Sequence, residues 1–203
     1  MSGGSHAKHL LQHWAPLPVL FMLLLAVTRG ITAAELIRSE VSYHDGAFSI
    51  EIAMDIRAGI DSTREILLDY NQTPRYNDNI TSSELLGVSA DGKMLGRVVI
   101  RDCVLSICRE LVQMQEMDRL PTGGVRIHVI PEQSDYRTAD YLWRFRRRPE
   151  GTTRLLVDAI IAPRIDMPPL IGPWIIARKI KQRLISVVNK LEKLSQHNGR
   201  RGN

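Results

Sequence analysis

Two cysteines stand five positions apart in the string CVLSIC, residues 103–108, and the chain contains no others. Along one extended strand they would lie about 16 Å apart, whereas a disulfide needs Cα atoms roughly 4.4–6.8 Å apart. A bond therefore requires a four-residue hairpin loop at Val104–Ile107 that places Cys103 opposite Cys108. Because an oxidising compartment favours pairing, we expect the disulfide; the alternative is one long strand with two reduced, buried cysteines.

A disulfide at this place would clamp an apolar loop tip made of Val104, Leu105 and Ile107. Exposed apolar tips are uncommon and suit contact with a membrane or with a partner protein. The alternative is that the tip folds back on the proline-rich segment at 163–173 and is buried. The residues do not separate these two interpretations.

Residues suited to catalysis are few. Beyond residue 34 the histidines are His44, His128 and His197, and each is more typical of a surface position than of a general base. No HExxH, paired CxxC or Gly-x-Ser-x-Gly motif occurs, so we expect no metal site and no cofactor. An enzyme would need an ionisable group facing a cavity; Asp102, Asp140 and His128 are the residues to inspect. We expect Asp140 on an outer face or near an open end.

The N-terminal residues follow the order of a secretory signal. Residues 1–16 are mostly polar, and the apolar run LPVLFMLLLAVT (17–28) precedes the small residues of RGITAAE. The run is about a dozen residues, shorter than the roughly 20 that a membrane-spanning helix needs. We therefore expect a signal peptide at 1–34, export with the periplasm as the compartment, and a single domain at 35–203. An uncleaved N-terminal anchor is the alternative, since Arg29 directly follows the run.

The charge of the chain argues against a nucleic-acid partner. The formal net charge is +5 and falls to +3 without residues 1–34, which hold Lys8 and Arg29 and no acid. This mild excess is compatible with an anionic membrane surface and weak evidence for one. The arginines of WRFRRRP (143–149) resemble the solvated end of a hairpin and lack an aromatic-interleaved binding motif.

Alternation of apolar and polar residues predicts an antiparallel sheet. Residues 48–56 alternate strictly, after the turn HDGA at 44–47 and a short leading strand at 36–43. Further strands follow, separated by hairpin-length gaps rich in Gly, Pro, Asp or Ser. We expect them at 81–89, 93–103, 108–119, 124–131, 135–147 and 151–162.

Helices are expected at two places. DSTREILLDY, with a capping box at Ser62 and Glu65, and TPRYNDNI, with Pro74 opening a turn, predict two short helices after the first strand. The C-terminal segment predicts one long amphipathic helix, because its apolar residues recur every three or four positions: Ile176, Ile180, Leu184, Val187, Leu191 and Leu194. The fold class is therefore α+β. A curved antiparallel sheet of about seven strands wraps around this helix and leaves a cavity between them.

This order and three strings resemble the START-like (SRPBCC) superfamily with its helix-grip fold, and most closely its coenzyme-Q-binding, polyketide cyclase/dehydrase-like branch. The strings are IRAGIDSTREILLDYNQTPRYNDNI (56–80), PEQSDYRTADYLWRF (131–145) and PPLIGPWIIARKIKQRLISVVNKLE (168–192). The resemblance spans about residues 40–195. It implies a ligand cavity between sheet and helix and leaves the ligand open, because this superfamily hosts many functions on one scaffold.

We expect one set of apolar and aromatic side chains to converge on that groove, although each taken alone is typical of an ordinary core. The set is Ile52, Met54, Tyr70, Tyr76, Tyr141, Trp143, Phe145, Trp174, Ile176, Ile180 and Leu184. The expected function is an exported, non-catalytic binding protein for a hydrophobic small molecule, a lipid or an isoprenoid quinone, with transient membrane contact. The alternatives are a cyclase or dehydratase acting on a bulky apolar substrate, and an interaction module whose core is filled by its own side chains.

Overall fold

The computed structural model describes residues 35–104, 107–164 and 172–201 of the 203-residue chain. Ala33–Asn203 belong to one compact unit. The predicted signal peptide at 1–34 lies outside the described residues, as does Leu105 of the predicted apolar tip. Of Val104 and Ile107 the backbone alone is described.

Eight antiparallel strands form one sheet, in the order β1-β2-β8-β7-β6-β5-β4-β3. The leading strand expected at 36–43 pairs with its neighbour along nearly its whole length, which adds the eighth strand to the seven expected. The other strands lie within two residues of their predicted ends. Their bounds are β1 Glu35–His44, β2 Ala47–Ile56, β3 Ile80–Val88, β4 Met94–Val104, β5 Ile107–Arg119, β6 Val125–Val129, β7 Tyr136–Arg147 and β8 Thr153–Pro163.

Short helices carry the chain from β2 to the far edge of the sheet, where β3 begins. They are α1 (Ile60–Leu68), η2 (Tyr70–Gln72) and α2 (Thr73–Tyr76). The predicted capping box is wrong, because the N-cap of α1 is Gly59, three residues before Ser62. The Ser62 hydroxyl donates to the Gly59 carbonyl at 3.0 Å. The side chain of Ser62 therefore bonds inside the first turn instead of capping it. Two further 3-10 turns, η3 (Pro131–Gln133) and η4 (Pro149–Gly151), join strands.

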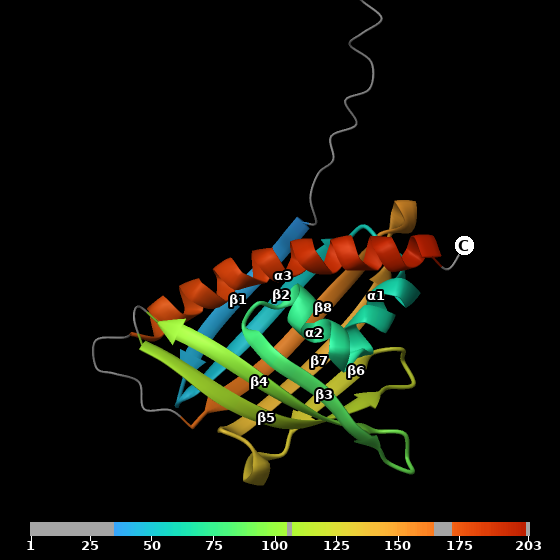
Figure 1. Ribbon diagram of the computed structural model, residues 1–203. Helices are drawn as coiled ribbons and strands as arrows, with labels where there is room; N and C mark the ends of the chain where they lie inside the picture. Colours follow the sequence, from blue (N-terminus) through green and yellow to red (C-terminus); the bar gives the residue numbers. More distant parts are fainter. Residues whose placement is uncertain (1–34, 105–106, 165–171, 202–203) are drawn as a thin grey trace, which may run out of the picture. The chain divides into compact units, whose positions relative to one another are not determined.

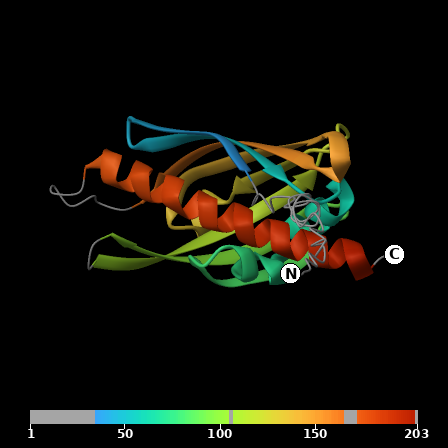
Figure 2. The same ribbon diagram turned by 90° about the horizontal axis from the view of Figure 1, so that it is seen from above.

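The long helix α3 (Pro173–Arg201) lies across the sheet, as Figure 1 shows. Seen from above in Figure 2, it runs between the β1–β2 side and the β3–β4 side of the curved sheet. Its second half is the tightly held part: Val188 and Leu191 are buried against β2 and α1. The buried carboxylate of Glu192 accepts bonds from the backbone amide and the guanidinium of Arg57, at 2.9 and 2.8 Å. This pairing fixes the end of β2 to the helix.

Candidate functional site

A cavity of about 680 Å³ lies between α3 and the sheet, a size common for small-molecule sites. The strands around it contribute alternate side chains, because successive residues of a strand point to opposite faces. Thus β2 supplies Phe48, Ile50, Ile52 and Met54, and β8 supplies Leu155, Val157, Ala159 and Ile161. The first half of α3 covers the cavity, and the walls are predominantly apolar. The interior is therefore not filled by the protein's own side chains.

Most of the predicted binding residues line this cavity. They come from four elements that lie far apart in the sequence, β2, α2, β7 and α3. These residues are Ile52, Met54, Tyr76, Tyr141, Trp143, Ile176, Ile180 and Leu184. That they touch a ligand stays a prediction.

Tyrosine hydroxyls are the polar groups within the apolar wall. The Tyr141 hydroxyl accepts a bond of 3.1 Å from the amide of Gln113, and burial raises the pKa of Tyr141. Burial raises the pKa of Tyr76 to about 12, and it also raises the pKa of Tyr136. These phenols therefore stay neutral at ordinary pH and act as hydrogen-bonding groups instead of charges.

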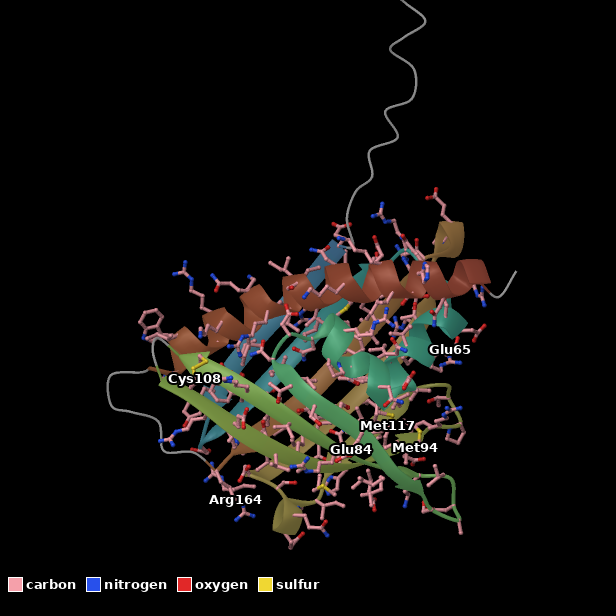
Figure 3. The ribbon with its side chains drawn as sticks, in the orientation of Figure 1. Glu65, Glu84, Met94, Cys108, Met117 and Arg164 are labelled. Atoms are coloured by element: carbon pink, nitrogen blue, oxygen red, sulfur yellow. A yellow bond between two sulfur atoms is a disulfide. The ribbon has the colours of Figure 1, made fainter. Side chains whose placement is uncertain are left out.

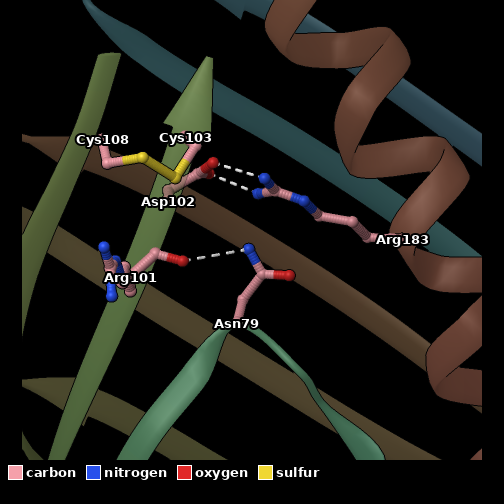
Figure 4. The surroundings of a disulfide bond; sticks show 6 residues. All are labelled: Asn79, Arg101, Asp102, Cys103, Cys108 and Arg183. Carbon is pink, nitrogen blue, oxygen red and sulfur yellow. Dashed lines mark hydrogen bonds and ion pairs between the residues drawn. A yellow bond between two sulfur atoms is a disulfide. The ribbon is translucent and has the colours of Figure 1, made fainter. Parts of the chain in front are cut away.

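One end of the cavity is polar. The sequence indicated Asp102 as a candidate to face the cavity, but not Arg183. Asp102 on β4 and Arg183 on α3 both line it and form a bidentate ion pair beside Cys103 and Cys108 (Figure 4). The side chain of Asn79 donates to the Arg101 carbonyl at 3.2 Å in the same region. The ion pair connects the helix to the sheet at the end opposite to Glu192. A signal was present in the sequence, since Arg183 stands three positions after Ile180 and so shares its helix face.

Comparison with known proteins is informative at the level of structure. A scan against protein-family models finds no match, and a search of curated proteins finds none either. Among solved structures, a START superfamily protein from Mycobacterium smegmatis is 15% identical with a TM-score of 0.58, over 73% of this chain and 97% of that one. The Zhui aromatase/cyclase from Streptomyces sp. R1128 is 12% identical with a TM-score of 0.60, over 74% and 94%.

A third similar structure is the STAR-related lipid transfer protein from Xanthomonas axonopodis, at 14% identity and a TM-score of 0.50, over 78% of this chain and 97% of that one. The chain has the START-like helix-grip fold. Identities this low show the fold, and the coenzyme-Q-binding branch stays a prediction.

Three of the predicted binding residues do not line the cavity of this START-like fold. Tyr70 is buried in a neighbouring cluster with Val98 and Met117, where its hydroxyl accepts from Gln115 at 3.2 Å. Phe145 lies one alternation beyond Trp143 and is covered by the guanidinium of Arg64, 5.3 Å from the ring centre.

The third is Trp174, whose side chain is 68% exposed in the first turn of α3. Periodicity correctly placed Tyr70 and Phe145 on the inward-facing side of their elements. It did not show where along the sheet the cavity ends. For Trp174 it did not identify even the face, because the first turn of a helix can project beyond the sheet.

The candidates for catalysis divide between two faces of the sheet. His128 and Asp140 are neighbours across β6 and β7 and hydrogen-bond to each other at 2.5 Å, each about half exposed, away from the cavity. Burial would raise the pKa of Asp140, but bonds from His128 and Thr138 outweigh it and the pKa is lowered. Asp140 thus lies on the outer face, as expected. Asp102 does face the cavity, with both carboxylate oxygens bound by Arg183.

The disulfide between Cys103 and Cys108 is confirmed, with 3.9 Å between the Cα atoms. The four-residue loop is wrong, because β4 and β5 continue pairing to Val104 and Ile107, beyond the cysteines. Two residues, 105–106, therefore separate the strands. The cross-link joins directly opposed strand positions instead of the ends of a loop.

No group of three or more His, Cys, Asp or Glu side chains among the described residues could hold a metal ion. No helix within residues 35–104, 107–164 and 172–201 has the length and apolar content to cross a membrane.

Proposed function

We propose that this protein binds a hydrophobic small molecule, a lipid or an isoprenoid quinone, in the cavity beneath α3 and performs no chemistry on it. The cavity itself carries the proposal: about 680 Å³ of space with mainly apolar walls would expose those walls to water unless a ligand covered them. Lack of catalysis is proposed because Asp102, the one carboxylate among the described residues lining the cavity, is bound by Arg183.

Export and transient membrane contact belong to the same proposal. The apolar run at 17–28 and the disulfide support export, since disulfides persist in oxidising compartments. Trp174 is exposed, and the helix segment that contains it (173–191) has five basic and no acidic residues. Both features support contact with an anionic membrane. Tryptophan suits the boundary between lipid and water because its ring is apolar and its N–H is polar.

Ile180→Arg tests whether the cavity is the binding site. Ile180 lines the cavity, so a charged side chain there would occupy the space or remain desolvated. We expect the affinity for the neutral dye Nile red, measured by fluorescence titration, to fall by about tenfold or more. Ile185→Arg is the matched control, because Ile185 lies on the same helix and is 49% exposed. Equal dye binding by both variants and the wild type would contradict the proposal.

The ligand class can be identified from a small molecule that co-purifies with the protein. Native mass spectrometry of the full chain, purified from a host that exports it, would report any co-purifying small molecule together with its mass. One equivalent of an apolar species supports the binding role. A bare protein that also fails to bind Nile red counts against it.

A further inference from the structure

Three arginines and a single carboxylate, Asp102, are among the residues that line the cavity. Arg109 on β5 is the register partner of Asp102 on β4, so both side chains project to the same face. Arg183 reaches the same carboxylate from α3. Arg164 follows β8, and its backbone is joined through Asp135 to Val112 on β5, three positions beyond Arg109. Figure 3 shows Cys108 beside the first turns of α3 and Arg164 lower down, near η3.

The positive charges of this cluster exceed the negative ones. Asp102 is the one acidic residue among the described residues that line the cavity, and its two oxygens are both bound by Arg183. Within the described part of the chain, Arg109 and Arg164 have no carboxylate within 4.0 Å. Arg164 donates to the carbonyls of Tyr136 and Pro131, and Asp135 accepts from the Val112 amide. Among the described residues, no carboxylate is thus paired with these two guanidinium groups.

The chemistry and position of these guanidinium groups suit the binding of an anion. A guanidinium presents a planar fork of N–H donors that matches carboxylate and phosphate oxygens. The Arg183 and Asp102 side chains are 28% and 33% exposed, so the charges of this pair are screened less than on an open surface. Directly beyond the cluster lie the apolar walls formed by Ile180 and Leu184. A polar anion-binding end continuous with an apolar cavity fits an amphiphile.

We propose that Arg109 and Arg183 bind the carboxylate or phosphate group of an amphiphile whose apolar chain lies in the cavity, and that Arg164 adds positive charge to the cavity lining. This inference rests on the proposed binding function and narrows its ligand class. It favours a fatty acid or a phosphate-bearing lipid over a neutral isoprenoid quinone. Arg183 stays paired with Asp102, which orients its guanidinium, while Arg109, which has no carboxylate within 4.0 Å among the described residues, supplies further positive charge.

Displacement of Nile red from the full chain by ligands of one chain length tests the proposal. We expect decanoate and decyl phosphate to bind about tenfold more tightly than decanol, because they add charge-assisted hydrogen bonds to the same apolar contacts. Inorganic phosphate, which carries the oxygens without a chain, should displace no dye. Equal displacement by inorganic phosphate and decyl phosphate would assign the site to a free anion and overturn the proposal.

Arg109→Glu should remove most of the preference for anions and leave decanol affinity unchanged. Arg109→Gln, which removes the charge without adding one, should produce a smaller loss and serves if the first variant unfolds. The matched control is Arg119→Glu, because Arg119 is also exposed and lies on the same strand about 33 Å away. Its preference should equal that of the wild type.

Two outcomes separate this inference from the proposed function. If decanol binds as tightly as the anions, or if Arg119→Glu and Arg109→Glu lose the same preference, the anion site is wrong and binding in the cavity stands. If Nile red and all three decyl compounds fail to bind, the proposed function and this inference both fail.

Discussion

The contact between Gly96 and Tyr70 shows how a single residue positions part of the core. A methyl group at Gly96 would lie 2.2 Å from the Tyr70 ring, so only glycine lets the ring cover β4. In that position the Tyr70 hydroxyl satisfies the buried side chain of Gln115, and the ring stays out of the cavity. The absence of a side chain on one strand thus decides where an aromatic residue from another element lies.

Gly96→Ala should therefore destabilise the protein by about 1–3 kcal/mol, because the ring must move and Gln115 loses its partner. Urea unfolding measures the change. Gly87→Ala is the control, since Gly87 is also in a strand and nothing lies within 4 Å of its added methyl group. Its stability should stay within about 0.5 kcal/mol of the wild type. A similar loss in both variants would show that glycine backbone freedom, and not the Tyr70 contact, is responsible.

At the scale of elements, the β4–β5 hairpin combines a covalent cross-link with an ion pair to α3. Cys103 and Cys108 close the hairpin, and the neighbouring Asp102 binds Arg183. The strand positions were predictable because alternation is a local pattern. The place where the strands end was not, since CVLSIC contains no Gly, Pro, Asn or Asp to mark the turn.

Reduction of the disulfide should lower the free energy of unfolding by about 2 kcal/mol, the loop-entropy contribution of so small a ring. Urea titrations with and without dithiothreitol measure it. The double variant Cys103→Ala/Cys108→Ala should have the stability of the reduced protein and no response to the reductant. A reductant effect that persists in the double variant would exclude the disulfide as its cause.

At the scale of the whole molecule, α3 has two halves with different surroundings. Its buried residues, Val188, Leu191, Glu192 and Ser195, all lie in the second half. From 173 to 187 the helix covers the cavity, and no side chain is fully buried. The half that covers the cavity therefore has fewer buried side chains and is joined to β4 by the Arg183–Asp102 pair, while the other half is fixed in the core.

Hydrogen exchange should show this difference. Amides of 173–187 should exchange faster than those of 188–199, because fewer buried contacts oppose local opening. Saturation with Nile red should slow the first half and leave the second unchanged. Uniform exchange along α3, or protection by the dye confined to the second half, would contradict the assignment of 173–187 as the cover of the cavity.

The sequence by itself determined the strands, the long helix and the order of the elements. These depend on periodicity and spacing, which a linear string contains. Only the tertiary structure decided that Tyr70, Phe145 and Trp174 lie outside the cavity and that Arg109, Arg164 and Arg183 line it. Alternation assigns a side chain to a face of the sheet, but its position along that face depends on strand register, sheet curvature and where the helix crosses. These are properties of residues distant in sequence, and no local pattern encodes them.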